Sequence, residues 1–297
     1  MAVSTERVAN TGNFGVAIPG VDRLVWYFLR VSGLMLVLLA GGHMFITHYL
    51  NLPSETVFDF VAARWSNPLW RTFDWLLLIS ALWHGVYGLR YAVSDYLRRP
   101  GWRVFGHSVI YVLGFVFTAL GTVTIFTFNE EAARENLGAL AGQLWIAEVI
   151  TWSLYAFAFL TYVAVPLLLL WVLRSYRTSG PPIYSGDPGQ YAWVFHRATG
   201  IGIVFFLLVH IIDIALIGLG RDLYDVSVEA YGNPLLIPME IALVAAVIYH
   251  TLNGLRIISI DFTRLGYKRE RQAFYAVLAL TVLLTLPSAI ILITGEL

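Results

Sequence analysis

The sequence predicts an all-α integral membrane protein of seven transmembrane helices, arranged as two parallel three-helix repeats joined by a return helix. Three observations predict this fold. The 297 residues are 58% hydrophobic with a mean hydropathy of +0.71, which is too apolar for an ordinary soluble domain. Several apolar runs exceed the roughly 18 residues that indicate a transmembrane helix. Polar residues inside these runs recur after 166 or 167 positions.

Seven apolar runs are long enough to cross the hydrocarbon core of a bilayer. In chain order they are 24–48, 69–97, 105–128, 143–173, 196–219, 235–262 and 272–294. The first twenty residues contain Gly, Pro, Asn and charges but no apolar core of a signal peptide, so we expect no cleavage. The chain therefore divides into a cytoplasmic N-terminal arm, a first repeat, a return helix with its linker, and a second repeat. Their predicted bounds are 1–21, 22–128, 129–189 and 190–297.

Polar residues carry the repeat, and they are informative because ionisable residues in lipid are costly and usually functional. The same residue types return in the same order in the first two helices of each repeat, and the turn 67–69 returns as 233–235. The matched positions are Arg30 with Arg197, Ser32 with Thr199, Gly33 with Gly200, His43 with His210, His84 with His250, Gly88 with Gly254, Arg90 with Arg256, Asp95 with Asp261, and Tyr96 with Phe262.

The return helix follows from the number of helices in each repeat. Three helices begin and end on opposite sides of the membrane, so two repeats share one orientation only if another helix brings the chain back. The run 143–173 is the one segment without a counterpart in the repeat. Corresponding residues of the two repeats then lie at the same depth, unlike those of inverted transporter repeats.

The basic residues indicate how the chain is oriented. With the N-terminus inside, most Arg and Lys side chains near helix ends fall on the cytoplasmic side, as the positive-inside rule requires. We therefore expect a multi-pass protein of a bacterial or archaeal plasma membrane, with its N-terminus in the cytoplasm and its C-terminus on the outer side. The basic residues assigned to the cytoplasmic side are Arg7, Arg23, Arg98, Arg99, Arg103, Arg174, Arg177, Arg264, Lys268, Arg269 and Arg271.

Four histidines lie at matched positions of the repeats. His43 and His210 are 13 residues beyond an inner-edge Arg, or about 20 Å at the helical rise, which puts them in the outer half of the bilayer. His84 and His250 precede an inner-edge Asp by 11 residues, about 16 Å, which puts them nearer the middle. A lone membrane histidine can bond a carbonyl or line a wet cavity, but four at matched positions favour ligation. Two imidazoles saturate a haem iron and suit it to electron transfer.

Other polar residues near the inner surface are candidates for further contacts. Cations there suit haem propionates, although Arg90 and Arg256 are equally well explained as positive-inside anchors. A Tyr hydroxyl and an Arg suit the two carbonyls of a quinone, with an Asp nearby to handle protons. An ion pair that closes the cytoplasmic end is an equal alternative. The propionate candidates are Arg30, Arg90, Arg197, Arg256 and His196, and the quinone candidates are Arg197, Tyr96 and Asp95.

Three histidines, His48, His107 and His196, lack a matched partner, and the chain lacks cysteine. His107 is expected to be structural, and His48, at the outer end of its helix, is assigned no role. Because there is no cysteine, the chain forms no disulfide and holds no iron–sulfur cluster by itself. Any such cluster must come from another subunit.

At these residues the chain resembles the membrane anchor of succinate dehydrogenase and fumarate reductase, respiratory complex II. The segment 196–200, His-Arg-Ala-Thr-Gly, is similar to the opening of the C-type anchor, and 250–256 with Asp261 is similar to its haem-bearing second helix. The segments 30–33 and 84–96 resemble the D-type anchor. The likeness covers nearly all of 22–295, in the order D-type then C-type. This order implies a fusion of two subunits, which is what the return helix permits.

The resemblance implies the ligands and partners of the chain. His84 and His250 are expected to ligate the haem b nearer the dehydrogenase, and His43 and His210 a distal haem b, as in the two-haem branch of the family. A flavoprotein subunit and an iron–sulfur subunit are expected on the cytoplasmic face. The residues implied for the quinone site are Arg197, Asp95, Tyr96 and Thr199.

One position departs from the family pattern. Many C-type anchors carry a quinone-contacting Ser one helical turn before the Arg, where this chain has Trp193. The departure changes the expected quinone pose. Two-haem anchors often go with menaquinone, which is therefore the favoured quinone.

The predicted function is a dihaem cytochrome b anchor that passes electrons between a cytoplasmic succinate-oxidising module and membrane quinone, within respiration and the tricarboxylic acid cycle. The chain has no group able to dehydrogenate succinate by itself. One alternative is the anchor of another dehydrogenase, such as a formate- or hydrogenase-type cytochrome b. Another is a transporter with buried structural histidines. A cytochrome of the bc type is less favoured because there two ligands share one helix.

Overall fold

The computed structural model describes residues 19–136, 138–177, 188–263 and 268–296. The described chain is helical almost throughout and contains no β-strand, so the all-α prediction is confirmed. Most of the predicted N-terminal arm (1–21) and part of the predicted linker lie outside the described residues.

Seven long helices follow the predicted apolar runs, and their bounds differ from the predictions by a few residues, except that the fifth begins at Pro188, eight residues before its predicted start. Proline begins several of them, because its missing N–H and fixed φ suit the first helical turn. At the start of the second long helix, Asn67 also accepts a hydrogen bond from the N–H of Leu69 (2.9 Å), which caps the helix. The seven are α1 (Pro19–His48), α3 (Pro68–Tyr96), α4 (Pro100–Thr127), α6 (Gly138–Arg177), α7 (Pro188–Ala215), α9 (Ile237–Phe262) and α11 (Glu270–Glu296).

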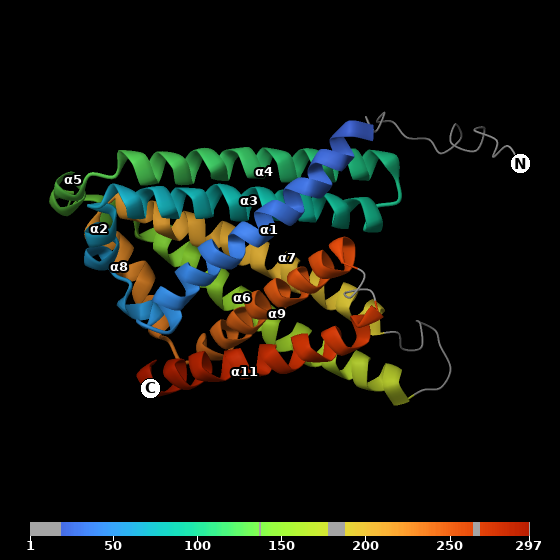
Figure 1. Cartoon of the computed structure of the whole chain (residues 1–297). Coiled ribbons are helices and arrows are strands. Elements are labelled where there is room, and N and C mark those ends of the chain that lie inside the picture. Colours follow the sequence, from blue (N-terminus) through green and yellow to red (C-terminus); the bar gives the residue numbers. More distant parts are fainter. Residues whose placement is uncertain (1–18, 137, 178–187, 264–267, 297) are drawn as a thin grey trace, which may run out of the picture.

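Six of the long helices qualify as membrane spans by length and composition among the described residues. The exception is α6, whose described apolar part is the shorter stretch Glu148–Ala164. The count of seven spans therefore stays a prediction, and it rests on α6. The start of α1 and the end of α11 lie at opposite ends of the bundle, as an odd number of crossings requires (Figure 1).

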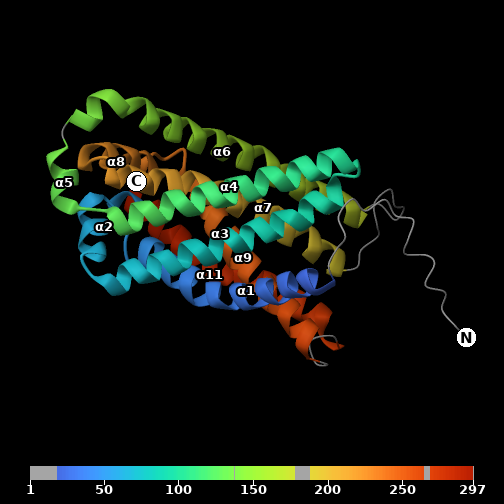
Figure 2. The ribbon, with the colours of Figure 1, turned by 90° about the horizontal axis from the view of Figure 1, so that it is seen from above.

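The long helices pack in the order of the two repeats. In the first, α1 packs on α3 and α3 on α4; in the second, α7 packs on α9 and α9 on α11. Contacts of α1 with α9 and of α3 and α4 with α7 join the two groups, and α6 lies along α7 and α9 (Figure 2). The helices that carry the matched histidines therefore meet at the centre of the bundle.

Short helices close one end of the bundle, which we call the capped end (Figure 1). The apolar face of these helices is buried, and Phe58 and Ile217, for example, are fully buried in the main hydrophobic core. The carboxylate of Asp225 accepts the N–H of Phe58 (2.7 Å) and so fixes the start of one short helix from a distant part of the chain. The capping segments are η2 (Pro53–Glu55), α2 (Phe58–Trp65), α5 (Glu130–Glu135), η3 (Leu216–Gly218), α8 (Arg221–Glu229) and η4 (Ala230–Gly232).

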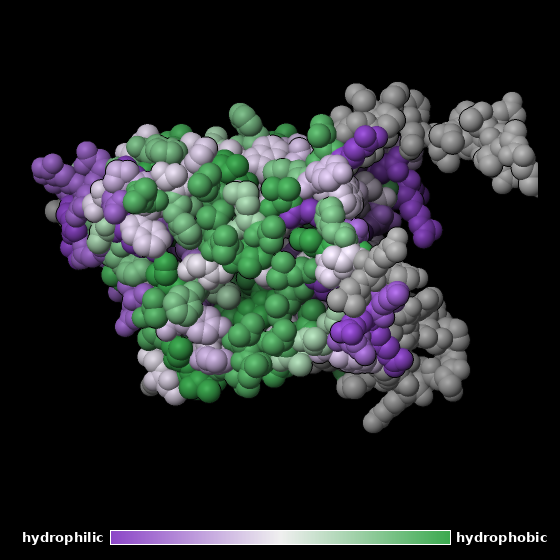
Figure 3. Space-filling view, in the orientation of Figure 1, coloured by the Kyte–Doolittle hydropathy of each residue, from purple (hydrophilic) through white to green (hydrophobic). Residues whose placement is uncertain are grey.

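The surface of the bundle is divided into three zones. Figure 3 shows hydrophobic side chains over the middle of the visible face and hydrophilic side chains at both ends. Large apolar residues such as Leu38, Phe115 and Trp152 are more than two-thirds exposed. In water such exposure would be unfavourable, but lipid chains solvate these groups as well as a protein interior does.

Candidate functional site

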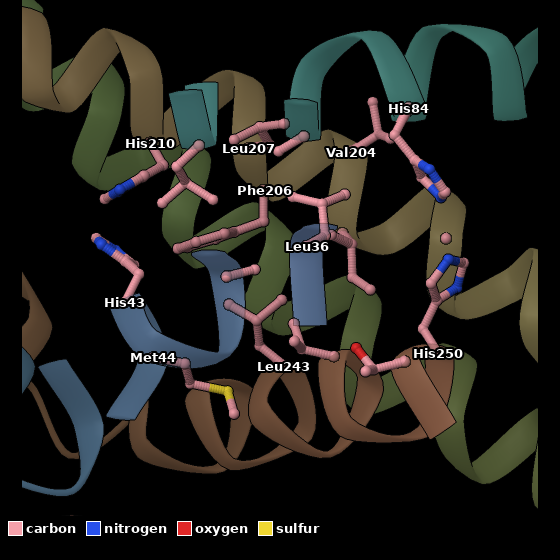
Figure 4. A pocket seen from close by; sticks show the side chains of 18 of the residues that line it. Leu36, His43, Met44, His84, Val204, Phe206, Leu207, His210, Leu243 and His250 are labelled. Atoms are coloured by element: carbon pink, nitrogen blue, oxygen red, sulfur yellow. The ribbon is translucent and has the colours of Figure 1, made fainter. Parts of the chain in front are cut away.

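The four matched histidines meet in two pairs at the centre of the bundle. His84 of α3 faces His250 of α9, with ring centroids 6.3 Å apart, and His43 of α1 faces His210 of α7 at 6.1 Å. Figure 4 shows the rings of each pair pointing toward one another. We call His43 and His210, nearer the capped end, the outer pair, and His84 and His250 the inner pair.

The separation within each pair suits one metal ion between two imidazoles. A bond from a metal to an imidazole nitrogen is about 2 Å, and the ring centroid lies about 1 Å behind that nitrogen, so centroids on opposite sides of one ion are about 6 Å apart. Among the described residues, no group of three or more His, Cys, Asp or Glu side chains is placed to hold a metal. A pair of axial imidazoles is the donor set of a haem, whose porphyrin supplies the other four nitrogens.

Both pairs open on one cavity of about 900 Å³, which is lined largely by apolar side chains. This volume is at the upper end of the range for ligand pockets, about 300–1,000 Å³. Phe206, Leu36 and Leu243 lie between the two pairs (Figure 4), and we call the parts of the cavity beside the inner and the outer pair its inner and outer parts. The ring of Phe206 also stacks on His210, with centroids 5.6 Å apart.

A hydrogen bond fixes the tautomer of His84. The hydroxyl of Ser32 donates to the carbonyl oxygen of Phe28 (2.7 Å), so its oxygen is left to accept from Nδ1 of His84 at 3.0 Å. The proton of the imidazole therefore resides on Nδ1. Nε2 keeps its lone pair free for a metal, as in metal-ligating histidines that donate their other N–H to a second group.

The second repeat builds the same arrangement around His250. The hydroxyl of Thr199 donates to the carbonyl oxygen of Phe195 (2.7 Å) and lies 3.3 Å from Nδ1 of His250. That Nδ1 is also 3.1 Å from the carbonyl oxygen of His196, which can only accept. Nε2 of His250 is thus free as well. The structure places Thr199, an expected quinone residue, beside this histidine.

Glycine lets the inner-pair rings pack closely on the neighbouring helices. A Cβ at Gly200 would lie 2.9 Å from Cε1 of His250, closer than side chains approach, and a Cβ at Gly33 would lie 3.4 Å from Cε1 of His84. The glycines therefore form part of the cradle that positions both imidazoles.

The outer pair has fewer polar contacts. Nδ1 of His43 is buried without a hydrogen-bond partner, although an unpaired buried polar atom costs stability. The neighbouring His48 instead shares a hydrogen bond between its Nδ1 and the hydroxyl of Thr47 (2.9 Å). A buried polar atom without a partner needs an explanation, and a molecule bound in the cavity would supply one.

Two ion pairs join the repeats at the end opposite to the cap. Arg30 donates from Nε and Nη2 to Asp261 (3.1 and 2.7 Å), and Arg197 pairs with Asp95 (2.5 Å). The partners exchange between repeats: the Arg of each one meets the Asp of the other. Each guanidinium also lies 4.4 Å from a Trp ring, Arg30 over Trp26 and Arg197 over Trp193.

The remaining expected contacts are spread over the same end. His196 stacks on His250 at 3.9 Å, and its buried Nδ1 has no hydrogen-bond partner. Arg256 donates to the carbonyl oxygen of Glu270 (3.2 Å), so part of its guanidinium is engaged by the start of α11. Tyr96 is 60% exposed at the end of α3. His107 contacts the hydroxyl of Ser94 (3.1 Å), away from the cavity.

Four charged residues at the outer part of the cavity were not singled out from the sequence. Their signal was available, because charged residues within or beside apolar runs are costly unless they have a function or a partner. Arg64 and Asp74 form an ion pair of 2.9 Å, and Asp213 and Glu240 are each 2% exposed. All four line the cavity.

Comparison with known proteins gives the family. Residues 13–121 and 174–287, more than half of the chain, match the model of the succinate dehydrogenase/fumarate reductase transmembrane subunit. The chain is 39% identical over 117 residues to the succinate dehydrogenase 2 membrane subunit SdhC of Mycobacterium tuberculosis, covering 39% of this chain and 86% of that relative.

A second relative is the succinate dehydrogenase hydrophobic membrane anchor subunit of Halobacterium salinarum. It is 31% identical over 108 residues, which cover 36% of this chain and 82% of that relative. These matches agree with the apolar helices and with the expected resemblance. The chain therefore belongs to the succinate dehydrogenase/fumarate reductase transmembrane subunit family and is a membrane-anchor subunit.

Proposed function

We propose that the chain is a dihaem cytochrome b anchor of succinate dehydrogenase that carries electrons between cytoplasmic flavoprotein and iron–sulfur subunits and quinone in the membrane. The proposal rests on two pairs of facing imidazoles that line one apolar cavity. The ring centroids are 6.3 Å apart in the inner pair and 6.1 Å apart in the outer pair. The inner pair is assigned to the haem b nearer the dehydrogenase and the outer pair to a distal haem b. The transporter alternative loses its support, because the chain belongs to an anchor family.

The proposal includes a fusion of a D-type repeat (22–128) with a C-type repeat (190–297) through the return helix α6. Two observations support it. The family match falls in two segments of similar length, and each relative corresponds to little more than a third of this chain. With the N-terminus in the cytoplasm, this arrangement puts the C-terminus on the outer side of a bacterial or archaeal plasma membrane.

The residues of the chain have separate tasks in this function. Bound haem supplies an iron that accepts and releases one electron at a time. Ser32 and Thr199 hold the inner imidazoles in the tautomer that keeps Nε2 free. The apolar wall, with Phe206 between the two pairs, keeps water from the cavity and sets the spacing of the two sites.

The quinone site is proposed at the end opposite to the cap, around Arg197, Asp95, Tyr96 and Thr199, with menaquinone the favoured quinone. Arg197 and the Tyr96 hydroxyl would donate to quinone carbonyls, and Asp95 would hold or release protons. The exposure of Tyr96 (60%) supports access to this site. The ion pair between Arg197 and Asp95 also fits the alternative that these residues only close this end of the bundle. Comparing Arg197→Gln with Arg30→Gln separates quinone binding from such a structural role.

Haem stoichiometry tests the proposed function. The complex, purified through a tag on this chain, is expected to contain two haem b per chain, together with a flavoprotein and an iron–sulfur subunit that oxidise succinate. Pyridine haemochrome absorbance per protein and mass spectrometry of the subunits give both quantities. A porphyrin-free complex would contradict the cofactor assignment, and a partner that oxidises formate or hydrogen would favour the alternative dehydrogenase.

The glycines beside the inner pair give a graded prediction. Gly200→Ala is expected to lower haem at the inner pair by about half or more, because its Cβ would displace His250, and small displacements of ligands have large effects. Gly33→Ala, with 3.4 Å available, is expected to have a smaller effect. Haem absorbance per purified chain measures both. Equal losses in the two variants would count against positioning by contact with these rings.

A further inference from the structure

The outer part of the cavity contains a cation to which the proposed function gives no role. Arg64 of α2 lines the cavity together with His43 and His210, and its side chain is 12% exposed. A partly buried arginine beside a proposed cofactor site needs a physical explanation, because removing a guanidinium from water is costly.

The guanidinium of Arg64 is held in place by contacts that use only some of its N–H donors. Nη2 donates to Asp74 (2.9 Å), and the guanidinium carbon lies 4.3 Å from the centroid of Trp70. The second oxygen of Asp74 accepts from Nε1 of Trp65 (2.8 Å), so the carboxylate is satisfied without further help from Arg64. Guanidinium has five N–H donors. In the described part of the chain, its hydrogen bonds engage Nη2 alone, which leaves other N–H groups for a molecule in the cavity.

Two acidic residues of the second repeat also line the cavity. Asp213 accepts hydrogen bonds from the hydroxyls of Ser227 and Tyr231, and Glu240 is buried nearby. Burial, with Asp213 and Glu240 close by, raises the pKa of Tyr231 well above its ordinary value, so its hydroxyl stays protonated. Carboxyl groups line the cavity from α7 and α9, whereas the guanidinium of Arg64 lines it from α2, so an anionic group in the cavity finds a cationic partner at α2.

The two repeats differ in the charges that they place at the outer part of the cavity. In the second repeat the positions of Trp65 and Asp74 are occupied by Tyr231 and Glu240, an aromatic and an acid again. The position of Arg64 is occupied by Ala230. At this matched position the first repeat has a cation and the second has none, so an asymmetric molecule between the outer imidazoles has one favoured orientation.

We propose that Arg64 binds a propionate carboxylate of the outer haem and so directs the anionic edge of that porphyrin toward α2 and the capped end. This inference rests on the proposed dihaem function. The sequence had placed propionate cations only at the inner end, where Arg30 is engaged by Asp261 and Arg256 in part by Glu270. A charged hydrogen bond from a planar guanidinium to a carboxylate is a strong and directional contact.

The experiment compares iron protoporphyrin IX with its dimethyl ester, whose propionates carry no charge. A full-length chain with His84→Ala and His250→Ala retains only the outer pair, and its haem-free form is titrated with each porphyrin. The free acid is expected to bind about tenfold or more tightly than the ester. Adding Arg64→Gln is expected to remove this preference, so that both porphyrins bind alike.

Arg71→Gln is the matched control. Arg71 is also an arginine of the capped end, but it donates to the carbonyl oxygens of Trp65 and Phe128 and does not line the cavity. Its variant is expected to keep the preference for the free acid. A loss of preference equal to that of Arg64→Gln would assign the effect to the capped end as a whole and overturn the inference.

The outcomes separate this inference from the proposed function. No binding of either porphyrin by a folded chain with an intact outer pair would overturn the dihaem function. Equal binding of acid and ester by a chain that contains Arg64 would overturn only the role of Arg64. If Arg64→Gln does not fold in that background, the same change in the intact complex is expected to lower the outer haem's reduction potential, because a positive charge that favours the reduced iron is lost. An unchanged potential would overturn the inference.

Discussion

Replacing His250 with alanine is expected to remove one of two haem b groups from each chain and to leave the other in place. The remaining His84 cannot hold the iron on both sides, while the outer pair lies beyond Phe206 and keeps both of its imidazoles. Haem per chain is therefore expected to fall from two to one. Pyridine haemochrome analysis measures the ratio, and low-temperature spectra identify which b-type band is lost.

The other histidines provide matched controls. His84→Ala is expected to lose the same band as His250→Ala, and His43→Ala and His210→Ala the complementary band. His107→Ala, at a histidine outside the cavity, is expected to keep both bands. Loss of both bands or of neither in His250→Ala would show that the pairs do not act as separate ligand sets.

Replacing Arg197 with glutamine is expected to lower quinone reduction by the complex about tenfold or more while succinate oxidation by a soluble dye is retained. The change removes a charged donor whose loss from a buried polar contact costs about 1.5–3 kcal/mol. The dye accepts electrons before they reach the anchor, so the ratio of the two activities isolates the quinone step. Steady-state assays of the same preparation with quinone and with dye give this ratio.

Arg30, the residue that matches Arg197 in the first repeat, provides a control that separates quinone binding from a purely structural ion pair. Arg30→Gln removes an ion pair of the same kind, with the same placement over a tryptophan ring. If Arg197 contacts quinone, its variant loses quinone reduction much more than Arg30→Gln does. Tyr96→Phe, which installs the residue type found at position 262, is expected to lower the same ratio. Equal loss of quinone and dye activity in Arg197→Gln would indicate a role in assembly.

The long helices were predictable because lipid imposes a simple rule on sequence. Every backbone group in the hydrocarbon region needs an internal partner, so a long apolar run there becomes a helix. Accordingly, α3 and α9 begin and end within a few residues of the predicted runs, and α7 ends within a few residues of its predicted end although it begins earlier. The pairing of the histidines was also expected from the sequence, because matched positions in two parallel repeats lie at equal depth in the membrane.

The short helices at the capped end were not predicted. The helix α2 has eight residues and α8 has nine, and each mixes charged and apolar side chains in a way that is also typical of loops. Their stability comes from distant contacts, such as the carboxylate of Asp225 at the N–H of Phe58 and the burial of Tyr224. Short helices are marginal by themselves, so such contacts decide whether they form.

By itself the sequence determined the all-helical fold class and the resemblance to the anchor family, and it predicted the parallel repeats and the depth of each histidine. These properties depend on composition and on distance along a helix. Only the tertiary structure decided which groups meet laterally: Arg30 meets Asp261 rather than Asp95, Nδ1 of His84 meets Ser32, and Arg64 reaches the cavity. The physical reason is that the helical rise fixes depth within one segment, whereas neighbours across the bundle depend on how all the helices pack together.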